Sequence, residues 1–127
     1  MKRFLLTFGL VAVAAISAAC SSSAAAQPVP AGPVDPSAPT IVAKDMAFAP
    51  STVEIAANKN VMLHFDNQDS APHNVAIYRD STASEKISVG EIVSAAKADQ
   101  GVPALVPGTY FFRCDVHTNM TGTIVVK

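Results

Sequence analysis

Cysteine is scarce in this chain, whose 127 residues include only Cys20 and Cys114. A disulfide that stabilises a folded domain needs both of its cysteines in that domain. Cys20 lies near the N-terminus, before a run of serine and alanine, so a bridge to Cys114 would tie a flexible leader to the domain, and we expect none. Cys114 is therefore predicted to be a free thiol, which in an oxidising compartment needs burial or a bound metal to protect it.

Basic residues are also few, with nine Lys and Arg against ten Asp and Glu. Loss of an N-terminal segment that contains Lys2 and Arg3 would leave seven basic residues against ten acidic ones, a net charge near −3. Proteins that bind nucleic acid usually present a clustered basic surface. The charge balance therefore argues against nucleic acid as a partner.

The apolar stretch at the N-terminus is short. Residues 4–16 carry no charge and directly follow Lys2 and Arg3. A transmembrane helix needs about 20 apolar residues, whereas a charged start followed by a shorter apolar run is typical of a secretory signal. We predict that residues 1–19 are a signal peptide and that the protein is exported.

Cys20 follows three small residues and precedes three serines, which is similar to a bacterial lipoprotein processing site, where the cysteine is lipidated and becomes the N-terminus. The alternative is ordinary secretory cleavage, after Ala19 or within residues 24–26, which would release a soluble protein. Residues 20–39 also contain five prolines, a composition that favours an extended spacer. The folded domain is thus predicted to cover residues 40–127.

Short segments of alternating apolar and polar residues, separated by turn residues, predict β-strands in this domain. The expected strands cover residues 40–44, 52–55, 61–66, 74–78, 102–106, 109–114 and 121–127, with a break at 46–50 and a short helix at 91–98. Val61, Leu63 and Phe65 are predicted to face inward. Seven to eight short strands, without a helical repeat or a βαβ pattern, are typical of an all-β sandwich.

Four side chains with metal-binding chemistry lie between positions 73 and 120. Taken singly, a loop histidine, a buried thiol and a packing methionine are all common in proteins. Taken together, one thiolate, two imidazoles and one weak thioether suit a copper ion that changes between two oxidation states. We therefore predict one copper in a type 1 (blue) site, with the ligands His73, Cys114, His117 and Met120. His64 alternates outward on an apolar strand and is assigned to the surface.

The same residues stand in longer motifs. The Pro-His-Asn tripeptide at 72–74, the Pro-Gly-Thr-Tyr-Phe-Phe-Arg-Cys run at 107–114 and the closing Met-Thr-Gly-Thr-Ile-Val-Val at 120–126 resemble the cupredoxin family. The Cys-x-x-His-x-x-Met spacing is similar to the ligand loop of amicyanin-like members, and the whole pattern is plastocyanin-like. The resemblance covers residues 40–127 and implies a Greek-key β-sandwich that holds copper at one end.

The resemblance also implies how the site is supported and used. In the family, the residue after the first histidine, here Asn74, donates a backbone hydrogen bond to the thiolate sulfur and ties two loops together, and such outer contacts tune the redox potential. The exposed edge of His117 would be the exit for the electron. The apolar residues expected around it are Ala71, Pro72 and Val116.

The protein is predicted to be an electron carrier, not an enzyme, and to work outside the cytoplasmic membrane. It is expected to be a monomer that passes electrons from a protein redox donor to a protein redox acceptor. Weak, transient docking and a lipid anchor in the membrane are expected. A copper-binding protein that sequesters or delivers the ion is the main alternative. Copper oxidases or nitrite reductases need further histidines, and only His64 remains; a binuclear centre needs a second cysteine beside Cys114.

Overall fold

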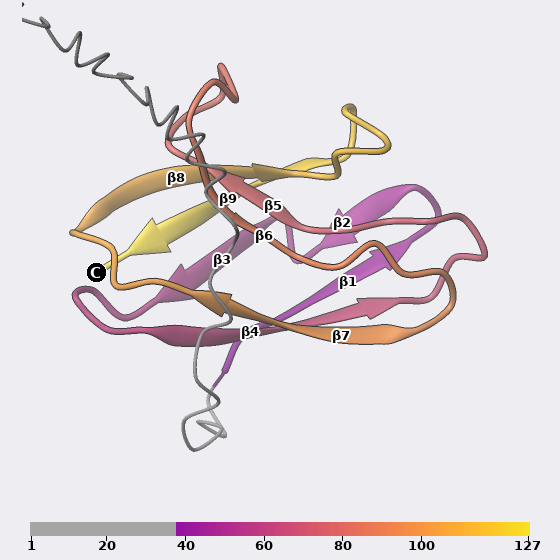
Figure 1. Ribbon diagram of the computed structural model, residues 1–127, viewed down its shortest axis with the longest axis horizontal. Coiled ribbons are helices and arrows are strands. Elements are labelled where there is room, and N and C mark those ends of the chain that lie inside the picture. Colours follow the sequence, from indigo (N-terminus) through magenta and orange to yellow (C-terminus); the bar gives the residue numbers. More distant parts are fainter. Residues whose placement is uncertain (1–37) are drawn as a thin grey trace, which may run out of the picture.

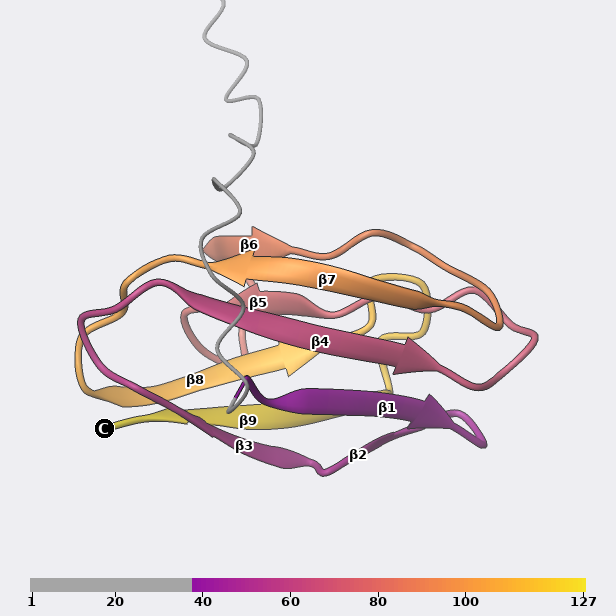
Figure 2. The same ribbon diagram turned by 90° about the horizontal axis from the view of Figure 1, so that it is seen from below.

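Nine β-strands and no helix form the part of the chain that the computed structural model describes, residues 38–127. The strands are β1 (Thr40–Lys44), β2 (Ala47–Ala49), β3 (Thr52–Ile55), β4 (Val61–Asn67), β5 (Ala76–Tyr78), β6 (Lys86–Val89), β7 (Lys97–Val102), β8 (Gly108–Arg113) and β9 (Thr121–Val126). They build one sheet in the order β2-β1-β4-β7 and a second in the order β3-β9-β8-β5-β6, stacked face to face (Figure 1, Figure 2).

Within these residues no helix is long and apolar enough to cross a membrane. The predictions for residues 1–19, for Cys20 and for most of the spacer lie outside the described residues.

The core lies between the two sheets because alternate side chains of each strand point to the same side. On β4, Leu63 and Phe65 are buried as predicted, and Val61 at the start of the strand is partly buried. The ring of Phe48 on β2 lies 6.3 Å from that of Phe65 and 5.3 Å from that of Phe112 on β8, so it joins the two sheets. The parallel pairs β1–β4 and β3–β9 lie inside otherwise antiparallel sheets. The predicted all-β Greek-key sandwich is confirmed.

The short helix predicted for residues 91–98 is wrong. Lys97 and Ala98 belong to β7, which pairs antiparallel with β4, and the residues before them form an irregular segment. Ala95 has a left-handed backbone with φ 47°, a conformation that cannot continue a right-handed helix. The carbonyl of Ala96 instead accepts a hydrogen bond from the backbone of Asn67. Strand pairing has therefore outweighed the local helical spacing of the alanines.

Several strand bounds also differ from the prediction; the strand expected over residues 74–78, for example, begins only at Ala76. Of residues 102–106 only Val102 is in a strand, at the end of β7, and Pro103 follows it without an N–H to continue the pairing. The break expected over residues 46–50 consists of a turn at Asp45 and Met46 and a bend at Pro50, and between them β2 pairs back on β1. The strand β6 was not predicted.

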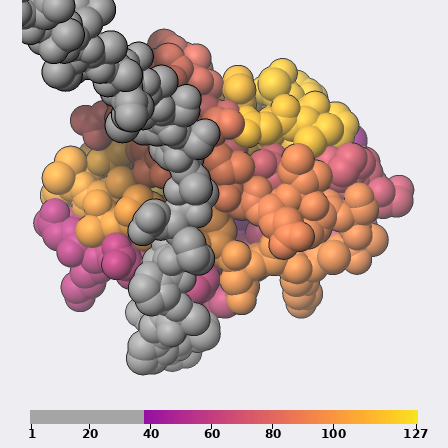
Figure 3. All heavy atoms as spheres, viewed as in Figure 1, coloured from indigo at the N-terminus to yellow at the C-terminus, as the bar shows by residue number. Residues whose placement is uncertain are grey.

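Four connecting segments meet at one end of the sandwich, on the right in Figure 1. They are the turn at residues 45–46, the loop at 68–75, the segment at 90–96 and the loop at 114–120. Backbone hydrogen bonds join the second to the third, between His73 and Val93, and the backbone of Asp115 is held by the side chain of Asn74. Figure 3 shows the yellow C-terminal part of the chain beside the orange part near residue 95 on this surface. The predicted metal ligands lie in two of these four segments.

Candidate metal centre

Cys114 directly follows β8. Alternate side chains of β8 point into the core, and Cys114 continues this pattern, so its thiol lies at the end of the core. Tyr110, Phe112 and Cys114 are all buried, and Cys114 has no exposed surface. Because β8 pairs on one side with β9 and on the other with β5, its end is fixed in the middle of a sheet. The cysteine is free, as the sequence predicts, and the fold protects it by burial.

The loop between β8 and β9 is closed by its own hydrogen bonds. The backbone N–H of Cys114 donates to the carbonyl of Met120 at 3.0 Å, and the N–H of Met120 donates to the carbonyl of His117 at 2.9 Å. The N–H of His117 approaches the sulfur of Cys114 at 3.4 Å. This tight loop brings His117 back beside the thiol, and Met120 is buried in the same core cluster as Cys114.

His73 reaches the same point from the loop after β4. Its backbone forms a β-bridge with Val93, with both hydrogen bonds at 3.0 Å, and its side chain is fully buried. The Nδ1 atom of His73 lies 3.8 Å from the sulfur of Cys114 and 3.1 Å from Nδ1 of His117. The structure thus places His73 beside Cys114 and His117, which lie 41 and 44 residues further along the chain.

These donor atoms fit a single metal ion. Bonds of about 2.0 to 2.3 Å from a metal to nitrogen and sulfur place the donors of one ion about 3 to 4 Å apart. The sulfur of Cys114 and the two Nδ1 atoms of His73 and His117 lie 3.1 to 4.0 Å from one another. Among the described residues, this is the group of His, Cys, Asp and Glu side chains that converges for metal binding. His64 is not part of it; it lies partly exposed on β4, 2.5 Å from the carboxylate of Asp99.

Asn74 ties the two ligand loops together through its side chain. Its Oδ1 accepts a hydrogen bond from the backbone N–H of Asp115 at 2.9 Å, and its Nδ2 donates to the carbonyl of Gly90 at 3.3 Å. Asn74 is buried, so these bonds are shielded from water. The expected backbone hydrogen bond from Asn74 to the sulfur of Cys114 stays a prediction.

Asp69 is a residue that the sequence analysis did not single out. Its Oδ2 accepts a hydrogen bond from Nε2 of His73 at 3.0 Å and one from the N–H of Met46 at 3.1 Å, while its Oδ1 accepts from the N–H of Asp45 at 2.8 Å. The bond from Met46 lowers the pKa of Asp69 most, burial opposes this, and Asp45 and His73 lower it further. Asp69 is therefore a carboxylate at neutral pH. An acidic residue four positions before His73 was the signal available in the sequence.

Asp115, next to Cys114, is held by three side chains of the second sheet. Tyr78 donates a hydrogen bond to Oδ1, Lys86 donates to Oδ2 at 3.0 Å, and Nε of Arg113 lies 3.5 Å from Oδ1. Burial alone would raise the pKa of Asp115, but the bonds from Tyr78 and Lys86 hold it below its ordinary value. The start of the ligand loop is thus fixed to β5, β6 and β8.

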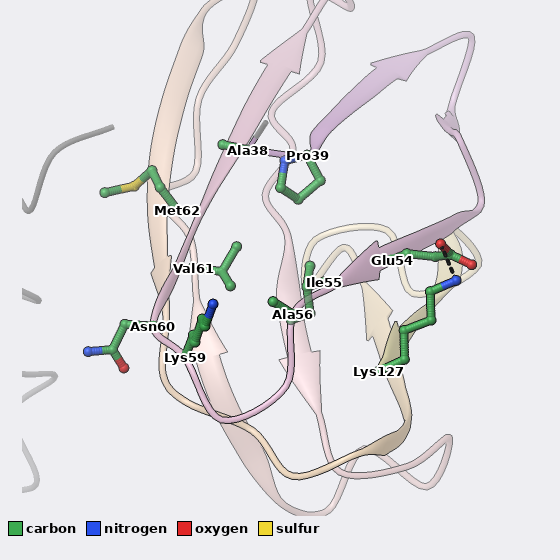
Figure 4. A pocket seen from close by; sticks show the side chains of 10 residues that line it. All are labelled: Ala38, Pro39, Glu54, Ile55, Ala56, Lys59, Asn60, Val61, Met62 and Lys127. Carbon is green, nitrogen blue, oxygen red and sulfur yellow. Dashed lines mark ion pairs between the residues drawn. The ribbon is translucent and has the colours of Figure 1, made fainter. Parts of the chain in front are cut away.

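A cleft of about 370 Å³ lies elsewhere, where β3 and β9 end and β4 begins (Figure 4). It is lined by Ala38, Pro39, Glu54, Ile55, Ala56, Lys59, Asn60, Val61, Met62 and Lys127. Lys127 and Glu54 form an ion pair at its rim, with 2.7 Å between Nζ and Oε2. None of the predicted metal ligands lines this cleft, so it is separate from the candidate metal centre.

Comparison with known proteins agrees with this fold. The model of the cupredoxin-like domain matches residues 9–126. The chain belongs to the cupredoxin-like family. A chloroplast plastocyanin of Hordeum vulgare is 32% identical over 88 residues, which are 65% of this chain and 56% of that protein. This cupredoxin-like chain therefore spans just over half the length of the plastocyanin that it matches.

Solved structures show the same fold. Auracyanin A, a "blue" copper protein of Chloroflexus aurantiacus, superposes with a TM-score of 0.62 at 19% identity, over 70% of this chain and 99% of auracyanin A. A reduced variant of amicyanin superposes with a TM-score of 0.57 at 20% identity, over 75% of this chain and 87% of the amicyanin. At these identities the likeness supports the cupredoxin sandwich, and the function must be argued from the site.

Proposed function

We propose that this cupredoxin-like protein is a mononuclear blue-copper electron carrier. The observation that carries the proposal is the convergence of the Cys114 sulfur and the Nδ1 atoms of His73 and His117 at one end of the sandwich. A thiolate with two imidazoles suits the copper of a blue-copper site, and the thioether of Met120 would be a further, weaker ligand. Bound copper would supply one-electron oxidation and reduction, and the chain holds the ligands for it.

The hydrogen bonds around the ligands favour fast electron exchange. Cys114 and His73 are fully buried, and the loop that bears His117 is closed by backbone hydrogen bonds at 2.9 and 3.0 Å. Ligands that are held in place by the fold rearrange little when the charge of the ion changes. The side chain of Asn74 adds a cross-link between the two ligand loops.

The exposure of the ligands indicates where an electron would enter or leave. His117 is partly exposed, whereas His73 and Cys114 are buried, so the His117 edge is the proposed exit. Pro72 and Val116 are exposed and Ala71 is partly exposed, which supports a small apolar docking face for the redox donor and acceptor. Small interfaces suit weak, short-lived complexes, as a monomeric shuttle requires.

The cellular setting follows from the N-terminal sequence. We propose export directed by residues 1–19 and attachment to the membrane through lipidated Cys20, with the domain facing the periplasm or the cell exterior. The proline-rich stretch at residues 20–39 would act as the spacer. A soluble exported protein is the alternative, if ordinary secretory cleavage occurs after Ala19 or within residues 24–26.

Absorption of the copper-loaded full chain tests the proposed function. A short bond between copper and the thiolate gives intense visible absorption, so the oxidised protein should be deep blue and should become colourless on reduction. Cys114→Ser should abolish the colour, whereas His64→Ala, which removes a histidine outside the centre, should retain it. If wild-type protein takes up copper without turning blue, the assignment is refuted. A reversible redox couple without copper loss supports the carrier, and ready release of copper to a chelator supports copper handling instead.

A further inference from the structure

We propose that Asp69 is a positioning residue of the metal centre, which fixes the ring of His73 for metal binding and links that ring to the turn between β1 and β2. This inference rests on the proposed copper site. It concerns a carboxylate outside the ligand set, on the loop that also carries the first histidine.

The first observation is the set of partners around His73. Its side chain is fully buried, and its two ring nitrogens face different groups: Nδ1 faces the sulfur of Cys114 and His117, while Nε2 lies 3.0 Å from Oδ2 of Asp69. A carboxylate accepts hydrogen bonds and donates none. The proton of a neutral His73 therefore belongs on Nε2, and the lone pair on Nδ1 is directed to the metal centre.

The second observation is the turn that shares this carboxylate. Asp45 and Met46 both have left-handed backbones, with φ 52° and 61°, which non-glycine residues adopt at a cost. Their N–H groups donate to the two oxygens of Asp69, at 2.8 and 3.1 Å. These bonds orient the carboxylate as well as the turn. The turn, Asp69 and His73 therefore form one connected unit, and the side chain of Asp69 is itself only 17% exposed.

The third observation is the charge of this group. A carboxylate that accepts the hydrogen bond of a ligating imidazole makes that imidazole a stronger donor. A negative charge beside the centre also favours the more positively charged, oxidised metal ion. Removal of the charge should therefore weaken metal binding and raise the redox potential, even if the fold is unchanged.

The test uses Asp69→Asn in the full chain, which keeps the size of the side chain and removes its charge. In the metal-free protein, the ring nitrogen signals of His73 in ¹⁵N NMR should change from a single Nε2-protonated form to a mixture of forms. The signals of His64, which pairs with Asp99, should stay as in the wild type and serve as an internal control. Copper affinity, measured with copper alone by competition with a chelator, should fall about tenfold or more.

A pair of substitutions in the turn separates an effect on the ring of His73 from an effect on the turn. Asn-Gly is the sequence that best accepts two left-handed residues in a hairpin turn, so Asp45→Asn with Met46→Gly should stabilise the turn without help from Asp69. If this pair restores wild-type tautomer and affinity in the Asp69→Asn background, Asp69 acts only on the turn and the inference is overturned. Unchanged His73 signals in Asp69→Asn overturn it as well. Wild-type protein that binds no copper would instead contradict the proposed function. The tautomer of His73 in the metal-free protein would still show whether Asp69 positions the ring.

Discussion

At the scale of single residues, Gly122 shows how a missing side chain shapes the core beside the centre. Gly122 on β9 lies opposite Phe112 on β8, and the fully buried Phe112 ring occupies the space above the glycine. A Cβ atom on Gly122 would lie 2.2 Å from Phe112 Cζ and 2.7 Å from the carbonyl oxygen of Ser51. Since neither the ring nor the backbone can move freely, the core would be overpacked.

Gly122→Ala should therefore destabilise the domain by about 1 to 3 kcal/mol, as overpacked cores do. The measurement is the free energy of unfolding from urea titration of the metal-free protein. Thr109→Ala, at an exposed position of β8, is the matched control and should change that free energy much less. Equal effects of the two substitutions would mean that Phe112 can move aside.

The sequence alone could identify the ligand residues better than the residues that support them. Cys114, His117 and Met120 stand within one short segment, so their spacing is visible without a fold, and His73 is joined to them by the chemistry of the set. Asp69 could not be found in this way, because its role depends on a turn at residues 45–46 that only the folded chain brings to it.

At the scale of elements, the segment at residues 90–96 supports the first ligand loop. Its backbone bonds with His73 run in both directions, from His73 N–H to the Val93 carbonyl and from Val93 N–H to the His73 carbonyl. The Val93 carbonyl also accepts from Nδ2 of Asn67, and the N–H of Ala95 donates to the carbonyl of Asp69. The helical spacing of these residues predicted the wrong structure, because the long-range hydrogen bonds determine the backbone conformation here. No local sequence pattern shows those bonds.

Val93→Pro should loosen this segment, because proline has no N–H to donate to the carbonyl of His73. We expect faster hydrogen exchange of the His73 amide in the metal-free protein and a copper affinity about tenfold lower, as loss of an outer contact usually gives. Val93→Ala keeps the backbone N–H and should leave the exchange rate near that of the wild type. Slow exchange in Val93→Pro would show that the loop is held without this bridge.

At the scale of the whole molecule, the metal centre and the start of the domain lie at opposite ends. β1 begins at Thr40 and runs about 13 Å to Lys44 at the usual strand rise, and the turn that follows contacts Asp69 beside the centre. Ala38 and Pro39 lie in the cleft shared with the ends of β3 and β9 (Figure 4). A tether that enters at this end would leave the exposed edge of His117 free to meet redox partners.

This arrangement predicts that anchoring and copper chemistry are independent. Cys20→Ala should move the protein from the membrane fraction to a soluble or unprocessed form, because the lipid would be lost, while the visible spectrum of the copper-loaded protein should not change. Residues 20–39, which we propose act as a spacer, would make this separation possible, since an extended linker transmits little strain to a domain. Fractionation of cells and the absorption spectrum of both forms provide the measurement. Wild-type protein in the soluble fraction, with a free N-terminus at or beyond Ser21, would point to plain secretory cleavage. An altered visible spectrum in Cys20→Ala would show that the N-terminal segment and the metal centre are coupled.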